Sequence, residues 1–346
     1  MTRLPTLTSF TALLALVAAC GKAEEPRPAR TQAQGGPAAA PAGEARRVTP
    51  GAERTVAVTF DDLPIAREGS YGPRRSEAVT TRLLAELRES GVPAIGFVNE
   101  DKLERRETSA VYTALLEEWL HAGMELGNHT FGHVSFRDTP LERYQREVLD
   151  GERVTRRLLA ERGQRPRFFR HPYLNTGSTL EDKQAFEAFL ADHGYQVAPV
   201  TIDNEDVVYA LAYDRAYEQG DSALMRRIGQ AYLEHMRESF AFYEGLSQRL
   251  LGREPAQVLM LHANALNADY LDELLGMLRG RGYGFVPIET ALRDPAYQLP
   301  DTYIDAQGVS WLQRWAVTQE KDPGEEPLAS DWVREAAEAE TLPAVR

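Results

Sequence analysis

Two neighbouring carboxylates at the end of a short apolar run are the first residues of this chain that could do chemistry. Residues 56–60 are mostly apolar and rich in β-branched side chains, so they predict a buried strand rather than a helix. We expect this strand to stop at Asp61 and Asp62, and Pro64 to keep it from continuing. Because a carboxylate at the mouth of a buried strand is costly unless it is paired, the two aspartates indicate a cation or a metal ion nearby.

Two histidines further along the chain are candidate ligands for such an ion. His129 and His133 are four residues apart, and on a helical turn this spacing puts both imidazoles on one side. With one carboxylate they would form a two-histidine, one-carboxylate site that leaves a coordination position for water. The histidine pair alone is a weak signal for metal, and the double aspartate strengthens it.

The elements that must position these residues alternate regularly. From residue 55 onward, short apolar runs alternate with longer amphipathic ones, which predicts a parallel sheet closed or nearly closed into a barrel. About fifty residues separate the fifth and sixth strands, so we expect a helical insertion at about 208–255, with 222–251 as one long helix or a bent pair. The predicted strands are 56–60, 94–98, 124–126, 167–170, 195–202, 257–261 and 284–288, and the predicted helices around them are 76–90, 109–122, 141–162, 179–193 and 269–279.

Polar side chains follow these strands at their carboxyl ends. In α/β barrels such side chains gather at one mouth of the barrel, where active sites are built. A single histidine at a strand end is more often structural. Polar residues that recur at the ends of several strands indicate an active site. They are Asp61 and Asp62 after the first strand, His129 after the third, Arg170 after the fourth, Asp203 and Asp206 after the fifth, and His262 after the sixth.

At this point the sequence resembles the polysaccharide deacetylase family, which carries the NodB-homology domain. The resemblance covers roughly residues 55–290 and implies a distorted seven-stranded (β/α) barrel of the NodB type. Five short motifs of that family occur here in order: Thr59-Phe60-Asp61-Asp62, His129-Thr130-Phe131-Gly132-His133, Arg170-His171-Pro172-Tyr173, Asp203-Asn204-Glu205-Asp206 and Met260-Leu261-His262.

The resemblance implies a general base and a metal site in the first two motifs. Asp61 would be the base, and Asp62, His129 and His133 would bind a divalent metal. Zinc is the first expectation because two imidazoles and a carboxylate suit it, while Co²⁺, Ni²⁺, Mn²⁺ and Fe²⁺ are alternatives for such a site. Amide hydrolysis needs an activated water and a polarised carbonyl, and a divalent metal supplies both.

The remaining motifs are implied to supply the acid and its support. Arg170 would hold Asp61, and the backbone at Tyr173 would help to stabilise the oxyanion. His262 would be the general acid, since histidine can be protonated near neutral pH. We expect Asp206 rather than Asp203 to orient it, because Asp206 matches the second aspartate of the family's fourth motif.

Two departures from the family pattern concern the substrate more than catalysis. Val207 stands where the fourth motif usually has tryptophan, and Met260 stands where the fifth usually has leucine. Met260 alternates with His262 along its strand, so both face the same side and Met260 would lie where an acetyl methyl sits. The candidate substrate-binding residues are Tyr173, Met260, Asp203 and His171.

Cys20, the only cysteine, indicates how the chain is targeted. A lone cysteine excludes an intrachain disulfide and cysteine-ligated zinc. The apolar run 10–19 is too short to span a bilayer and ends in small residues before Cys20, which resembles a bacterial lipobox. We therefore expect a signal peptide at 1–20, a lipidated Cys20 that anchors the chain to a membrane, and a flexible tether at 21–54. Gly21 is not the aspartate of inner-membrane retention, which favours the outer membrane, facing the periplasm, in a Gram-negative cell.

The remaining organisation and composition complete the hypothesis. The catalytic domain is expected at 55–300 and a helical extension with a frayed tail at 301–346, with Trp311 and Trp315 on one packed helical face. A net charge of −13 without a basic stripe argues against nucleic acid as a partner, and no protein partner is indicated. The sequence thus predicts a metal-dependent hydrolase that removes N- or O-acetyl groups from a glycan of the cell envelope or the exterior. The alternatives are an amidase of the same fold that acts on non-sugar C–N bonds, and an inactive glycan-binding protein.

Overall fold

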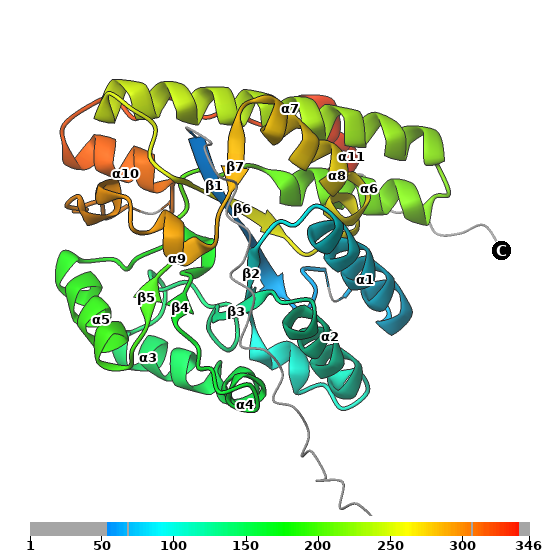
Figure 1. The fold of residues 1–346 in the computed structure, drawn as a ribbon, viewed down its shortest axis with the longest axis horizontal. Helices are drawn as coiled ribbons and strands as arrows, with labels where there is room; N and C mark the ends of the chain where they lie inside the picture. Colours follow the sequence, from blue (N-terminus) through cyan, green and yellow to red (C-terminus); the bar gives the residue numbers. More distant parts are fainter. Residues whose placement is uncertain (1–53, 68, 306, 339–346) are drawn as a thin grey trace, which may run out of the picture. The chain divides into compact units, whose positions relative to one another are not determined.

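The strands of the described chain all pair in parallel within one sheet (Figure 1). A computed structural model describes residues 54–67, 69–305 and 307–338. Six strands follow the order β5-β4-β3-β2-β1-β6, and β7 pairs with the beginning of β1. The strands are β1 (Arg54–Leu63), β2 (Ala94–Val98), β3 (Glu125–Asn128), β4 (Phe168–Phe169), β5 (Gln196–Val197), β6 (Gln257–His262) and β7 (Tyr283–Phe285).

The segment after β5 closes the sheet into a ring. Near its start, the Ala198 N–H donates to the carbonyl of Phe169 on β4. At its other end, Ile202 forms a parallel bridge with Leu259 on β6. One short segment therefore joins the two edge strands, and the predicted distorted barrel is confirmed.

Helices follow the strands and surround the sheet. Figure 1 shows α1 and α2 together on one flank, α3, α4 and α5 on another, and the long α7 across the top of the view. The α-helices between β1 and β7 are α1 (Pro73–Glu89), α2 (Ser109–His121), α3 (Leu141–Asp150), α4 (Arg153–Ala160), α5 (Leu180–Asp192), α6 (Asp206–Glu218), α7 (Ser222–Leu251) and α8 (Ala265–Gly280). The 3-10 helices and the α-helices after β7 are η1 (Glu100–Leu103), η2 (Pro172–Leu174), α9 (Ile288–Ala291), η3 (Pro295–Gln298), α10 (Trp311–Thr318) and α11 (Asp331–Glu338).

The first strand runs further than the sequence indicates. The prediction that it stops at the two aspartates is wrong, because β1 continues to Leu63, which pairs with Val98 of β2 after an irregularity that begins at Phe60. Asp62 lies within this irregularity with a φ of 67°. In a regular strand neighbouring side chains point to opposite faces. The left-handed residue breaks that alternation and allows both aspartates to reach the same pocket.

The predicted helix 141–162 is divided into α3 and α4. At Gly151 a Cβ atom would lie 2.6 Å from the Phe131 nitrogen, so the helix passes against the loop 129–133 with no room for a side chain. The second helix then begins with its own cap, as the Glu100 carboxylate accepts the N–H groups of Val154 and Thr155. The break between α3 and α4 therefore lies where the chain packs against the loop that carries the two histidines.

Three predicted strands are shorter in the structure. β4 and β5 have two residues each, because the chain on either side turns into loops that carry site residues. The seventh strand ends at Phe285 rather than at residue 288, since Pro287 lacks an N–H for the ladder and precedes the first residue of α9.

The insertion and the extension pack onto the barrel. Residues 222–251 form one helix, α7, whose first N–H groups donate to the Asp221 side chain and which ends at Gly252 with a φ of 68°. α6 packs between α7 and α11, and α10 also contacts α7. Trp311 and Trp315 are both buried on one face of α10, as the spacing predicts.

Some expectations concern residues that the structure leaves undescribed. The signal peptide at 1–20, Cys20, the tether up to residue 53 and the tail after residue 338 all lie outside the described residues. In the part of the chain that is described, no helix combines the length and the apolar character needed to cross a membrane.

Candidate active site

A pocket of about 1000 Å³ opens at the carboxyl ends of the strands and collects most of the predicted site. The last residues of β1, the loop after β3 that carries the two histidines, and the loop after β4 form its walls. The segment after β5 and the end of β6 complete it. Its lining comprises Asp61, Asp62, His129, His133, Val134, Ser135, Asp138, Thr139, Tyr173, Leu174, Asn175, Asp203, Asn204, Val207, Met260, His262, Gln307 and Gly308.

Asp61 lies at the bottom of this pocket against the guanidinium of Arg170. The Arg170 Nη1 is 3.2 Å from each carboxylate oxygen, and the other nitrogens donate to the Ala198 carbonyl at 2.7 Å and the Thr59 hydroxyl at 3.0 Å. Arg170 is fully buried, so its position is fixed from all sides. Burial raises the pKa of Asp61 while the guanidinium opposes that shift, which suits a carboxylate that accepts a proton.

Asp62, His129 and His133 form the candidate metal centre. The Asp62 Oδ1 lies 3.8 Å from the His129 Nε2 and 3.4 Å from the His133 Nε2, and one donor atom from each residue lies within 4.8 Å of the others. Burial lowers the pKa of both imidazoles, so they are neutral and can offer a lone pair. The His129 Nδ1 lies 2.9 Å from the Arg170 carbonyl, which leaves Nε2 as the ligand atom. The three residues therefore fit a small divalent cation.

The two histidines meet in an irregular loop, not on the helical turn expected from their spacing. Thr130 and His133 both have positive φ, at 66° and 51°. Three residues outside the predicted site hold the loop: the Asn99 amide donates to the His129 carbonyl, Asn128 accepts the Thr130 N–H, and Glu147 accepts the Gly132 N–H at 2.9 Å. Sequence analysis missed these contacts because they join residues that no local pattern relates.

Lys102 is a further residue that the sequence analysis missed. Its ammonium donates to the carbonyls of Asp62 and Ile65 and lies 4.0 Å from the Asp62 carboxylate. Burial acts to raise the pKa of Asp62, but Lys102 and then His133 act more strongly together and lower it. Lys102 therefore keeps this ligand ionised and holds the unusual backbone around it.

His262, at the end of β6, is paired with the buried Asp206, the first residue of α6. The His262 Nδ1 lies 2.8 Å from the Asp206 Oδ1, and the Asp206 Oδ2 accepts the His262 N–H at 2.9 Å and the Asn267 amide at 2.7 Å. Burial lowers the pKa of His262, but Asp206 outweighs it and raises the pKa to about 10. His262 is also the register partner of Asp61 on the neighbouring strand. The structure thus places the candidate acid beside the candidate base.

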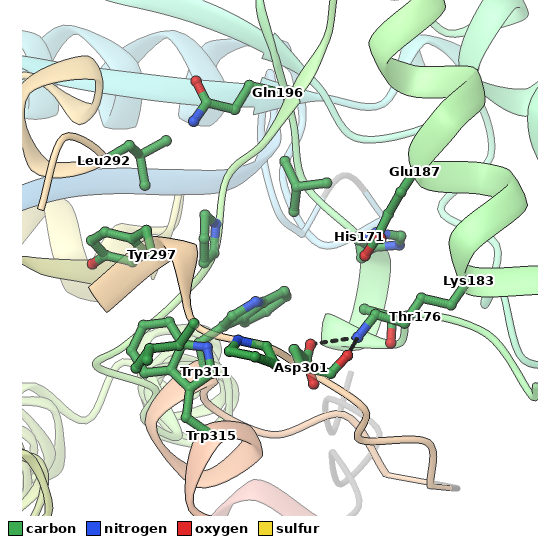
Figure 2. A pocket seen from close by; sticks show the side chains of 14 residues that line it. His171, Thr176, Lys183, Glu187, Gln196, Leu292, Tyr297, Asp301, Trp311 and Trp315 are labelled. Carbon is green, nitrogen blue, oxygen red and sulfur yellow. Dashed lines mark hydrogen bonds and ion pairs between the residues drawn. The ribbon is translucent and has the colours of Figure 1, made fainter. Parts of the chain in front are cut away.

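The four candidate substrate-binding residues lie in two places. Tyr173, Met260 and Asp203 line the pocket, with the Tyr173 ring 4.5 Å from that of His133. Burial, reinforced by the Glu326 carboxylate, raises the pKa of Asp203 to about 7. His171 does not line this pocket, contrary to expectation. Its ring stacks near Tyr144 and faces a separate cavity behind the loop (Figure 2).

We predict that Asp206→Asn lowers the pKa of His262 strongly. The amide retains a hydrogen-bonding shape but no charge, so the effect of burial then prevails. An NMR titration of the His262 ring measures the shift, and Asp203→Asn is the matched variant because Asp203 makes no hydrogen bond to His262. The native pair stabilises the fold fully below the ordinary value of 6.5, and this contribution is lost as pH rises through about 10. Equal shifts in the two variants would contradict the pairing.

Comparison with known proteins finds a family match for the part of the chain that carries Asp61, Asp62, the two histidines and Arg170. The model of the polysaccharide deacetylase family matches residues 49–198. A peptidoglycan-N-acetylglucosamine deacetylase of Bacillus cereus is 27% identical over 147 residues, which are 42% of this chain and 59% of that protein. The chain thus spans less than two thirds of the curated relative that it matches.

Two solved structures show weaker likeness. The peptidoglycan deacetylase PdaC from Bacillus subtilis is 19% identical with a TM-score of 0.43, covering 69% of this chain and 90% of that chain. A family 4 carbohydrate esterase from Streptomyces lividans, in complex with acetate, is 21% identical with a TM-score of 0.41, covering 69% and 96%. The family match ends before Asp203, Asp206 and His262, which join the site through the geometry described above. Residues 49–198 of this chain thus match the domain of the polysaccharide deacetylase family.

Proposed function

We propose that this protein is a metal-dependent hydrolase that removes acetyl groups from a glycan of the cell envelope. One observation carries the proposal: a buried base and a partly buried acid stand side by side on β1 and β6, next to three candidate metal ligands in one open pocket. Together these parts can activate a water, polarise the acyl carbonyl and protonate the leaving group, which is what hydrolysis of an acetyl group requires. None of them is lost in this chain, which disfavours an inactive glycan-binding protein.

The residues divide the proton transfers between them. Asp61 is held in place by Arg170. It accepts a proton from the attacking water while the oxygen of that water bonds to the acyl carbon. His262, held by Asp206, gives a proton to the leaving nitrogen or oxygen as the acyl bond breaks. The N–H of Tyr173 faces the developing charge on the acyl oxygen. Acetate and the free amine or hydroxyl are the products.

Asp62, His129 and His133 are the residues that would hold the metal. When bound, a divalent ion acts as a Lewis acid on the acyl carbonyl and makes a water easier to deprotonate. Two imidazoles and one carboxylate favour zinc, and other first-row metals suit the same donor set.

The substrate class follows from the pocket and from the curated relative. The pocket mixes apolar side chains such as Met260 and Val207 with hydroxyl and amide groups, as a sugar with an acetyl group requires. The relative in Bacillus cereus is named for deacetylation of peptidoglycan N-acetylglucosamine, which makes an N-acetylated envelope glycan the first substrate to test. Amidase action on non-sugar C–N bonds is the alternative.

Acetate release from three substrates tests the proposal. The purified, zinc-supplemented protein is incubated with an N-acetylated chitooligosaccharide, an O-acetylated xylooligosaccharide and a small aliphatic amide. We expect acetate from at least one of the two glycans and no hydrolysis of the amide. Hydrolysis of the amide alone would establish the amidase instead, and glycan binding without acetate would establish a binding protein.

We also propose that the chain is anchored to a membrane through lipidated Cys20. A Cys20→Ala variant is expected to lose membrane association, because the apolar run before it cannot form a stable span. Fractionation of cells that express each form measures this, with a Cys20→Ser variant as a second form that cannot be acylated through sulfur. Retention of either variant in the membrane fraction would contradict the lipobox. An outer-membrane location facing the periplasm is the corresponding proposal for a Gram-negative cell.

A further inference from the structure

The loop after β4 contains two consecutive residues in a conformation that L-amino acids rarely adopt. Tyr173 has a φ of 56° and Leu174 a φ of 52°. Residues other than glycine are disfavoured at positive φ, and they keep this conformation only where the surrounding structure holds them. Both residues line the candidate active-site pocket. The contacts that hold this loop therefore determine the direction of the Tyr173 N–H.

The support comes from the C-terminal extension through Arg314. Its Nη1 donates to the Leu174 carbonyl at 3.4 Å, and its Nη2 donates to the Thr176 hydroxyl and to the Tyr303 carbonyl. The Nε donates to the Asp301 carboxylate at 2.8 Å. Arg314 is 1% exposed. One buried cation thus joins the loop to two parts of the extension.

Gly308 supports the same loop from the pocket side. A Cβ atom at this position would lie 1.9 Å from the Tyr173 carbonyl oxygen and 2.7 Å from the Leu174 carbonyl carbon. The extension therefore passes directly over the peptide that joins Tyr173 to Leu174. Gly308 and its neighbour Gln307 also line the pocket, so this part of the extension is a wall of the active site.

The barrel leaves a space behind the loop. A cavity of about 390 Å³ lies between α5, the loop and the extension, with His171 and Thr176 among its lining residues. Figure 2 shows Lys183 reaching across it toward Asp301, with Trp311 and Trp315 on the side of the extension. The Lys183 ammonium is 2.6 Å from the Asp301 carboxylate, so Asp301 receives both Lys183 and Arg314. With a cavity behind it, the loop has room to relax once this contact is removed.

We propose that Arg314 is a positioning residue for catalysis, which fixes the Tyr173 peptide so that its N–H meets the acyl oxygen. The inference rests on the proposed deacetylase function and extends it to a segment beyond the residues matched by the family. Arg314 itself touches no reacting atom and acts through the loop. The extension is therefore part of the catalytic apparatus.

The test compares Arg314→Ala, Arg314→Lys and Arg281→Ala in the full chain. Arg281 is the matched control, because it makes a paired contact with Glu244 and lines none of the site. We expect Arg314→Ala to lower kcat by about 10²-fold, the effect of removing one oxyanion donor. KM, the pH dependence of kcat/KM and the bound metal should stay as in the wild type, since Asp61, His262 and the candidate metal ligands do not touch Arg314. Guanidinium ion should restore part of kcat in Arg314→Ala but not in Arg281→Ala, and Arg314→Lys should restore less than half of the lost activity.

A second variant and a second measurement keep the inference testable if Arg314→Ala folds poorly. Gly308→Ala should give the same loss of kcat by displacing the Tyr173 carbonyl, whereas Gly276→Ala, where a Cβ meets nothing within 4 Å, should not. Amide exchange of residues 171–177 should accelerate in Arg314→Ala regardless of activity. Unchanged exchange, or a kcat loss no larger than that of Arg281→Ala, would overturn the inference. A wild-type protein that releases no acetate while exchange still accelerates would overturn the proposed function and leave the support of the loop established.

Discussion

Replacing Asp61 with asparagine is expected to lower kcat/KM by about 10³-fold, within the range that general-base catalysis supplies. The amide keeps the size of the carboxylate and its contact with Arg170, but it cannot accept a proton from water. The three candidate metal ligands are untouched. Steady-state kinetics on the best glycan substrate measure the loss.

Metal content is the internal control for this variant. Asp61→Asn should bind one equivalent of zinc as the wild type does, because its oxygens are not needed by the Asp62, His129 and His133 set. Turnover close to that of the wild type would show that another group takes the proton. Loss of the metal together with activity would show that Asp61 is a ligand, in keeping with the 3.8 Å between its carboxylate and the His129 Nε2.

Removing both imidazoles is expected to abolish metal binding and activity together. In the His129→Ala, His133→Ala double variant, only the Asp62 carboxylate remains of the three candidate ligands. Because a metal that binds only the folded state stabilises it, a metal at 1,000 times its Kd contributes about 4 kcal/mol in the wild type and nothing in the variant. Metal analysis after dialysis and thermal unfolding with and without zinc measure the two effects.

His121 provides the matched control for that experiment. It is an exposed histidine at the end of α2, so His121→Ala changes the histidine content without changing the site. This variant should retain both the metal and the zinc-dependent rise in Tm. A double variant that still binds one equivalent of metal would refute the assignment of the ligands.

Local patterns in the sequence were enough to predict most of the strands and helices and to place the candidate catalytic groups along the chain. β2 has the predicted bounds, because its apolar run is flanked by a glycine turn on one side and polar residues on the other. Asp61, Arg170 and His262 could be placed at strand ends for the same reason. Parallel strands bring their carboxyl ends to one edge, so the convergence of these residues follows from the alternation of strands and helices.

The parts that could not be predicted depend on contacts between distant segments. Asp62 has positive φ although nothing in its neighbourhood favours it, and its backbone is held by Lys102, forty residues later. The histidine loop is held by Asn99 and Glu147 rather than by helical hydrogen bonds. His171 lies within the third motif, yet its ring stacks near Tyr144 and lines the cavity behind the loop rather than the candidate active-site pocket. Periodicity carries no information about such pairings.

The closure of the barrel has a consequence for where this protein opens first. The segment 196–202 joins β4 to β6 through a two-residue strand and one isolated bridge, whereas β1 and β6 pair over six residues. Regions with few ladder hydrogen bonds open locally at lower free energy than core strands. Asp203 and Asp206 follow this segment directly, so a brief opening would move Asp206 away from His262 without disturbing the candidate metal ligands. The C-terminal extension is hydrogen-bonded to the segment 196–202. The Trp311 N–H donates to the Val200 carbonyl, and the Ser310 hydroxyl donates to the Thr201 carbonyl. We therefore expect the lifetime of the assembled acid–base pair to depend on how firmly the extension, through Ser310 and Trp311, holds the segment 196–202, rather than on the stability of the barrel as a whole.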